Sequence, residues 1–133
     1  VITIIDLKNE SPKRLLVVDD EINMQIMYKK VLSRIDVMVD TAGSFDEAVN
    51  KFRNRDYSLL LIDIRLSKSD GLELLQTLRK ENPSVPAIMV TGYPSIYSAS
   101  RSKELGAFDY LTKPIEINEL NASVDRALAS VRI

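Results

Sequence analysis

The sequence contains no cysteine and no histidine. Without cysteine the chain can form no disulfide and offers no thiolate nucleophile, and without either residue type it cannot build a zinc site of the Cys/His kind. General-base catalysis by imidazole is excluded as well. Any chemistry must therefore come from carboxylates, hydroxyls, lysine or a hard metal ion bound through oxygen. The lack of disulfides also suits a reducing, cytoplasmic location.

A strong charge of one sign and long apolar runs are missing too. The chain has 18 basic and 19 acidic residues and a net charge of −1, whereas a nucleic-acid-binding surface requires a basic excess or patch. No apolar run is long enough to cross a bilayer. We therefore expect neither direct nucleic-acid binding nor membrane insertion.

Short runs rich in leucine, isoleucine and valine recur along the chain, at 14–19, 37–41, 58–63, 87–91 and 107–111. Three of these runs are almost continuously apolar, which is typical of parallel strands covered by helices on both faces. Helical patterns lie between them, in an order that indicates an α/β domain. We predict a flavodoxin-like three-layer (βα)5 sandwich whose five-stranded parallel sheet has the strand order 2-1-3-4-5.

Five helices are indicated by the spacing of apolar residues. A capping-box sequence at 44–47 marks the start of the second, Asn82-Pro83 ends the third, and the fourth, about 95–105, has a thin apolar face. The expected buried stripes are Met24, Met27, Tyr28, Val31 and Leu32; Phe45, Ala48, Val49 and Phe52; Leu72, Leu75 and Leu78; Ile96, Ala99 and Leu105; and Ile117, Leu120, Val124, Ala127, Leu128 and Val131.

The first twelve residues fall outside this alternation, so we expect the folded domain to comprise 13–133. The β-branched residues of 1–12 could add an edge strand, and a loose leader is an equally good interpretation.

Polar residues stand at the carboxyl ends of four predicted strands, where parallel sheets bind ligands. The first strand ends at Asp19 and Asp20, the third at Asp63 and the fourth at Thr91, and Lys113 follows the fifth. Because the first and third strands are neighbours in the predicted order, the three carboxylates should meet. They would then need a cation, and a site of oxygen ligands alone favours Mg²⁺. With a hydroxyl and a lysine, such a site suits phosphoryl transfer to an aspartate nucleophile.

Each of these residues alone has a simpler interpretation. Asp20 and Glu21 could merely favour the start of a helix, and Asp63 could be a turn or cap residue. Thr91 is followed by glycine, a pair that is usually a turn, and Lys113 would by default be a solvated surface lysine. The coincidence of their positions at one end of the sheet favours the functional interpretation.

These segments together resemble the receiver domains of two-component response regulators, from about residue 13 to the end of the chain. The matching stretches are LLVVDDE (15–21), LLLIDIRL (59–66) with Asp70-Gly71-Leu72, MVTGY (89–93) and GAFDYLTKP (106–114). The run from TGYPSI to LGAFDYLTKP is most similar to receivers attached to nitrogen-regulation-type transcription activators.

The resemblance implies a role for each matched residue. Asp63 would be the phosphoacceptor. Asp20 would bind Mg²⁺ directly, Asp19 would act through water, and the backbone carbonyl of Arg65 would be the third protein ligand of the metal.

The same resemblance assigns the residues around the phosphoryl group. The Thr91 hydroxyl would follow that group and the Lys113 ammonium would contact it, with a cis bond before Pro114. Tyr110, which on its own would more often be a core residue, would be the aromatic switch.

The family's activity further implies a sensor histidine kinase or a histidine phosphotransfer protein as phosphoryl donor. Such a domain is not a conventional enzyme, since it accepts the group from phosphohistidine and slowly removes it again. We expect a switched surface, and a homodimer, at the fourth helix, fifth strand and fifth helix.

The sequence departs from the family at Ser67, where proline is usual four residues after the phosphoacceptor, so a more mobile loop at 67–70 is expected. Arg65 and Tyr93 stand at variable positions and are expected to tune dephosphorylation. A phosphorylation-independent interaction module is the alternative, although such modules typically lack one of the acidic, threonine or lysine residues present here. A phosphohydrolase would usually carry a second acid at the position of Arg65.

Overall fold

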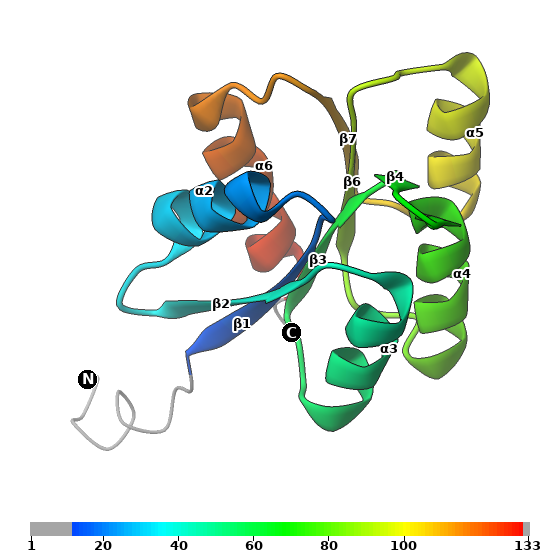
Figure 1. The fold of residues 1–133 in the computed structure, drawn as a ribbon. Helices are drawn as coiled ribbons and strands as arrows, with labels where there is room; N and C mark the ends of the chain where they lie inside the picture. Colours follow the sequence, from blue (N-terminus) through cyan, green and yellow to red (C-terminus); the bar gives the residue numbers. More distant parts are fainter. Residues whose placement is uncertain (1–11, 132–133) are drawn as a thin grey trace.

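A computed structural model describes residues 12–131, so the edge strand or leader expected in 1–12 lies almost wholly outside the described residues. Five parallel strands form one sheet in the order β2-β1-β3-β6-β7 (Figure 1). In order along the chain, this is the predicted 2-1-3-4-5 arrangement, which is thereby confirmed. The strands are β1 (Lys13–Val18), β2 (Val37–Ala42), β3 (Leu59–Asp63), β6 (Ala87–Thr91) and β7 (Asp109–Thr112).

The central strands are buried along their whole length, as their continuous apolar sequences predict. Every residue of β3 and of β6 is buried. The register pairs Asp63 with Val90 and Thr91 with Thr112, so the carboxyl ends of β3, β6 and β7 lie at one edge of the sheet. The last strand begins at Asp109 rather than at 107, since the chain turns through Gly106 (φ 76°) and the Ala107 amide still donates to the Ser102 carbonyl of the preceding helix at 2.9 Å.

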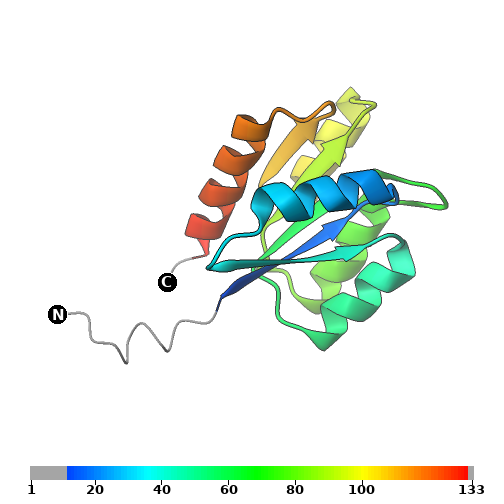
Figure 2. The ribbon, with the colours of Figure 1, turned by 60° about the vertical axis from the view of Figure 1, so that its left-hand side comes forward.

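Helices cover both faces of this sheet (Figures 1 and 2). Helices α2 (Ile22–Leu32) and α6 (Ile117–Ser130) pack on one face, while α3 (Phe45–Asn54), α4 (Gly71–Glu81) and α5 (Ile96–Glu104) lie on the other. The predicted capping box is present, because the Glu47 amide donates to Ser44 Oγ at 3.2 Å and the Glu47 carboxylate accepts from the Gly43 amide at 2.7 Å. Four of the five predicted stripes supply buried residues to the two cores.

The apolar stripe predicted for the fourth helix is wrong at Ile96, whereas Leu105 packs against the core as predicted. Ile96 at the start of α5 is 88% exposed, and the buried residues of this helix are Ser98 and Ser102. Their hydroxyls are satisfied locally, since Ser102 Oγ donates to the Ser98 carbonyl at 2.7 Å and Ser98 Oγ lies 2.6 Å from the Tyr110 hydroxyl. A serine that bonds the preceding turn can be buried without cost to its hydroxyl, so hydropathy misleads here. Two ends of the last stripe, Ile117 and Val131, are also partly solvent-exposed, at 50% and 38%.

The loop after β3 contains a small hairpin that the sequence pattern does not predict. Strands β4 (Arg65–Leu66) and β5 (Ser69–Asp70) pair antiparallel around a turn that contains Ser67. Asp70 then caps α4 by accepting the Leu72 amide at 2.8 Å. The hairpin thereby fixes the path of the chain between the end of β3 and the next helix.

Within residues 12–131, no helix combines the length and the apolar character that a membrane span requires.

Candidate functional site

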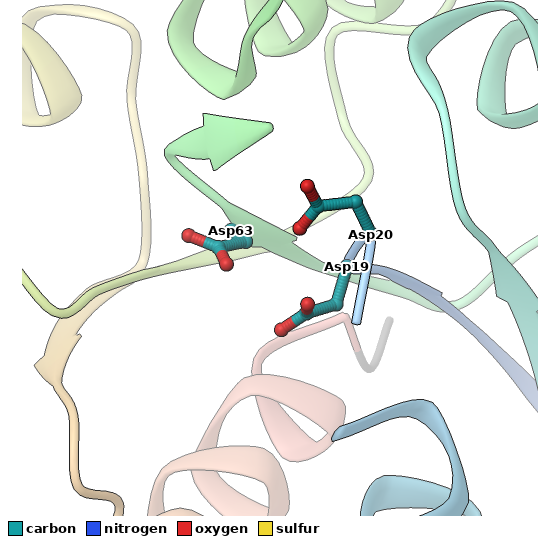
Figure 3. A group of neighbouring side chains, drawn as sticks. All are labelled: Asp19, Asp20 and Asp63. Carbon is teal, nitrogen blue, oxygen red and sulfur yellow. The ribbon is translucent and has the colours of Figure 1, made fainter. Parts of the chain in front are cut away.

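Three aspartates meet at the carboxyl ends of β1 and β3. Asp19, Asp20 and Asp63 each place a carboxylate oxygen within 4.8 Å of the others. Figure 3 shows their side chains extending toward the same side of the two strand ends. Asp19 is fully buried and Asp63 is 5% exposed. The predicted convergence of the acidic pair with Asp63 is confirmed.

The two buried carboxylates are held in the same way. Asp19 Oδ1 accepts the Glu21 amide at 2.9 Å, and Asp63 Oδ1 accepts the Arg65 amide at 3.1 Å. In each residue the second oxygen is left to face the partner across the site. The simpler interpretation of Asp63 as a turn residue therefore accounts for its Oδ1 atom but not for its Oδ2 atom. The Glu21 side chain makes no capping hydrogen bond to α2.

Lys113 lies between these second oxygens. Its Nζ is 2.7 Å from Asp63 Oδ2 and 3.1 Å from Asp19 Oδ2, and its side chain is 17% exposed. The Lys113–Pro114 peptide bond is cis, as the resemblance implies. Lys113 is therefore a partner of the buried carboxylates and not a solvated surface lysine.

The charges of the site are strongly coupled. Burial raises the pKa of Asp19, although the Glu21 amide and Lys113 oppose this effect. Burial alone would lower the pKa of Lys113, but its hydrogen bonds to Asp63 and Asp19 outweigh burial and raise that pKa. The cluster of three carboxylates contains one ammonium, which contacts Asp19 and Asp63, so the cluster is short of positive charge. An oxygen donor set with this deficit fits Mg²⁺.

An open cavity of about 620 Å³ lies over the carboxylates. It exposes Asp20 and Asp63 to a ligand, with the lysine on one wall and the β4 hairpin on another. The lining residues are Asp20, Glu21, Asp63, Arg65, Leu66, Ser67, Gly92, Tyr93 and Lys113. Arg65 and Ser67, both noted in the sequence, are therefore part of the site.

Thr91 and Tyr110 lie beside this cavity and do not line it. Thr91 Oγ1 accepts the Tyr93 amide at 3.0 Å, and its side chain lines a second cavity of about 600 Å³ next to α5. The Tyr110 hydroxyl accepts the Ser95 amide at 3.3 Å, in addition to its contact with Ser98. The structure thus brings together Asp19, Asp20, Asp63 and Lys113, and places the two residues expected to switch next to α5.

A cation–π contact separates the two cavities. The Arg65 guanidinium carbon lies 4.2 Å from the centroid of the Tyr93 ring, and both residues line both cavities. Arg65 and Tyr93, which are expected from the sequence to tune dephosphorylation, are therefore in contact with each other at the rim of the acidic site.

Sequence reasoning assigned no task to two residues that hold the site. The Gly71 amide donates to the Ile64 carbonyl at 2.7 Å, and the Gln25 side chain donates to the Asp19 carbonyl at 2.7 Å. Gly71 belongs to the Asp70-Gly71-Leu72 segment, which resembles the corresponding segment of receiver domains. That resemblance indicates that Gly71 could be important. For Gln25, only its position one helical turn after Glu21 places it near the acidic residues.

We expect Gly71→Ala to distort the main chain that carries Asp63. A Cβ atom at position 71 would lie 2.2 Å from the Asp63 carbonyl oxygen and 2.8 Å from Ile64 Cα. The variant should lose about 1–3 kcal/mol in the free energy of unfolding, measured in urea. Gly92→Ala is the matched control, because a Cβ there would meet only the Lys113 side chain at 3.8 Å. Equal stability of the two variants would contradict this prediction.

The comparisons with known proteins agree with this geometry. Residues 15–125 match the family described as response regulator receiver domain. The transcriptional regulatory protein ZraR of Escherichia coli O157:H7 is 34% identical over 119 residues, which are 90% of this chain and 27% of that protein. The DNA-binding transcriptional regulator NtrC of Klebsiella pneumoniae is 33% identical over 113 residues, or 85% of this chain and 24% of that protein. The chain therefore spans about a quarter of the length of these relatives.

Solved structures give the same result. A CheY-like response regulator receiver domain protein from Methanospirillum hungatei JF-1 superimposes with a TM-score of 0.86 at 33% identity, over 90% of this chain and 96% of that one. NtrX from Brucella abortus superimposes with a TM-score of 0.81 at 32% identity, over 88% of this chain and 27% of that one. The fold and the resemblance to receivers of nitrogen-regulation-type activators agree with the sequence interpretation.

Proposed function

The chain belongs to the response regulator receiver domain family of two-component systems, and we propose that this member accepts a phosphoryl group on Asp63. The observation that carries the proposal is the lysine contact: Lys113 Nζ joins Asp63 Oδ2 to Asp19 Oδ2 at the floor of an open acidic cavity. We assign the domain to 13–133.

The donor in this proposal is a phosphohistidine on a sensor histidine kinase or a histidine phosphotransfer protein. A carboxylate oxygen of Asp63 forms the new bond to phosphorus as the bond from phosphorus to the donor's imidazole nitrogen breaks. The imidazole leaves with the electron pair of the broken bond. Slow attack of water on the acyl phosphate then releases inorganic phosphate and restores the carboxylate.

The site's own residues supply positioning and charge. The Arg65 amide fixes Asp63 through Oδ1, and Lys113 is placed to neutralise charge that develops on the phosphoryl oxygens. Asp19, Asp20, Asp63 and the Arg65 carbonyl would hold Mg²⁺, which would supply further neutralisation of the charge on the transferring phosphoryl group. The charge deficit of the cluster supports this metal assignment.

Phosphorylation would act on α5 through two residues. The added group brings roughly −2 charge or slightly less, and Thr91 would move its hydroxyl toward it. Tyr110 would then occupy the space that Thr91 vacates, and its hydroxyl would lose its contact with the Ser98 hydroxyl of α5. The weak packing of this helix supports the idea, since its buried side chains are Ser98 and Ser102.

The switched surface in this proposal comprises α5, β7 and α6. Large apolar side chains lie exposed on α5 and α6, including Ile96, Tyr97 and Ile117. We assign a homodimer to this surface. The relatives are transcriptional regulators, so we extend the proposal to transcriptional control by the whole protein, with the DNA contacts made outside this domain. The cytoplasm, where the kinase acts, is the location assigned.

Incubation with acetyl phosphate and Mg²⁺ tests the proposal. We expect mass spectrometry to show one added phosphoryl group in the wild type, and no adduct when EDTA is present from the start. Asp63→Asn should also form no adduct, because the substitution keeps the size of the side chain but removes the nucleophile. Asp56→Asn, at an exposed position away from the site, is the control. An adduct that persists in Asp63→Asn would show that another residue is the acceptor.

The same experiment separates the alternatives. A phosphorylation-independent interaction module would form no adduct, either as the wild type or as Asp63→Asn. A phosphohydrolase would release phosphate steadily from an added phosphomonoester, and the proposal expects no such turnover.

A further inference from the structure

The main chain leaves the sheet between the two acidic residues that follow β1. The Asp19 amide still donates to the Ala42 carbonyl of β2 at 3.0 Å. The Asp19 carbonyl has left the strand ladder and accepts the side-chain amide of Gln25, on α2, at 2.7 Å. This carbonyl and the Asp20 amide belong to one planar peptide unit. A side chain that fixes the carbonyl therefore also fixes the direction in which the chain enters Asp20.

Asp20 depends on its backbone more than the other two carboxylates do. Asp19 and Asp63 are each held by an amide and by Lys113. Among residues 12–131, the Asp20 carboxylate takes part in no hydrogen bond or ion pair with a side chain or amide that could orient it. Its position relative to the other two thus depends on the two peptide units that flank it, one held by Gln25 and the other by the bond from the Glu21 amide to Asp19 Oδ1.

Gln25 is itself confined. Its backbone amide donates to the Glu21 carbonyl at 3.1 Å in the first turn of α2, and its side chain is half-buried. Gly43 lies beside it, and a Cβ atom there would be 3.2 Å from Gln25 Nε2, a tight contact. The absence of a side chain at position 43 leaves the amide room to reach the Asp19 carbonyl.

From these contacts we propose that Gln25 is a positioning residue for the metal site: by holding the Asp19–Asp20 peptide unit, it aims the Asp20 carboxylate at the point where Mg²⁺ binds. The inference rests on the proposed function, since it requires that the acidic cluster bind Mg²⁺. Residues that orient metal ligands typically change metal affinity by about 10- to 100-fold when they are replaced. Gln25 acts through the backbone and touches neither the metal nor the phosphoryl group.

Two substitutions at this position separate the effect of losing the hydrogen bond from the effects of changing the charge or the size of the side chain. Gln25→Met keeps the length of the side chain and removes the donor. Gln25→Glu keeps the shape, removes the donor and adds a negative charge close to the cluster, which by electrostatics alone would tighten Mg²⁺ binding. The matched control is Gln76→Met, at an exposed position on α4.

Calorimetric titration of each metal-free protein with Mg²⁺ gives the dissociation constant, and unfolding in urea with EDTA reports the fold. We expect both Gln25 variants to bind Mg²⁺ at least about tenfold more weakly than the wild type, with urea midpoints in EDTA close to that of the wild type. The Asp20 amide resonance should shift in both variants, and Gln76→Met should match the wild type.

Mg²⁺ binding within about twofold of the wild type in Gln25→Met would overturn the inference and leave the proposed function intact. Tighter binding in Gln25→Glu would also overturn it, because charge would then outweigh positioning. A wild-type protein that does not bind Mg²⁺ would overturn the proposed function as well.

Discussion

Lys113→Met is expected to lower the free energy of unfolding of the metal-free protein by about 3 kcal/mol. Asp19 and Asp63 are 0% and 5% exposed, and both lose the ammonium that they share in the wild type. A buried carboxylate left without a partner is far more costly than the intact pair. Urea unfolding in EDTA measures the loss, and Lys80→Met, at an exposed position on α4, is the control.

Mg²⁺ should reverse much of this loss. A divalent ion among the carboxylates replaces the missing positive charge, so the gain in stability on adding Mg²⁺ should be larger in Lys113→Met than in the wild type. The rate of phosphoryl uptake should nevertheless fall by about 100-fold or more, because Mg²⁺ does not replace the donor aimed at the phosphoryl oxygens. A variant as stable as Lys80→Met in EDTA would contradict the structural part of the prediction.

The lysine therefore has two tasks in our interpretation. In the metal-free protein it stabilises buried carboxylates, and during phosphoryl transfer it neutralises the incoming group. The raised pKa of Lys113 supports the first task, since its two hydrogen bonds outweigh burial and keep the ammonium charged. A neutral side chain of similar length could perform neither.

The part of the site that lies on strand ends could be predicted from the sequence. Continuous apolar runs identify buried parallel strands, and parallel strands place their carboxyl ends at one edge of the sheet. Asp19, Asp63 and the lysine after β7 follow from this rule alone. The contact between the two aspartates needs only the neighbourhood of β1 and β3, which the strand order provides. Lys113 follows β7, which β6 separates from β3, so its contacts with the aspartates do not follow from strand order alone.

Helix α5 shows why other features could not be predicted. Ile96 was expected to be buried because it is apolar, yet Ser98 and Ser102 face the core. Their burial depends on hydrogen bonds to a preceding carbonyl and to Tyr110, which hydropathy does not report. The Gln25 contact has the same character, since a single amide–carbonyl bond leaves no periodic pattern.

The pattern of polar and apolar residues could not predict local chain reversals either. The β4–β5 hairpin consists of two-residue strands, too short to show alternation of polar and apolar residues. It nonetheless determines where Arg65 and Ser67 stand on the cavity wall. The expected mobility of residues 67–70 remains a prediction.

Asp20→Asn is expected to have the opposite effect on stability from the lysine variant. The substitution removes one negative charge from a cluster whose carboxylate oxygens lie within 4.8 Å of one another, so the metal-free protein should gain about 1 kcal/mol or more in the free energy of unfolding. Burial, and to a smaller extent the charge of Asp63, raise the pKa of Asp19, so this carboxylate is ionised at a cost in free energy.

The same variant should bind Mg²⁺ at least about tenfold more weakly, since the proposed direct ligand is lost, and should accept the phosphoryl group correspondingly more slowly. Urea unfolding in EDTA and calorimetric titration with Mg²⁺ measure the two effects in one protein. Asp56→Asn removes an exposed charge away from the site and should change neither quantity. A less stable Asp20→Asn protein in EDTA would show that Asp20 supports the fold. The opposed signs expected for Asp20 and Lys113 follow from the proposed function, in which this edge of the sheet binds a cation and a phosphoryl group at the expense of metal-free stability.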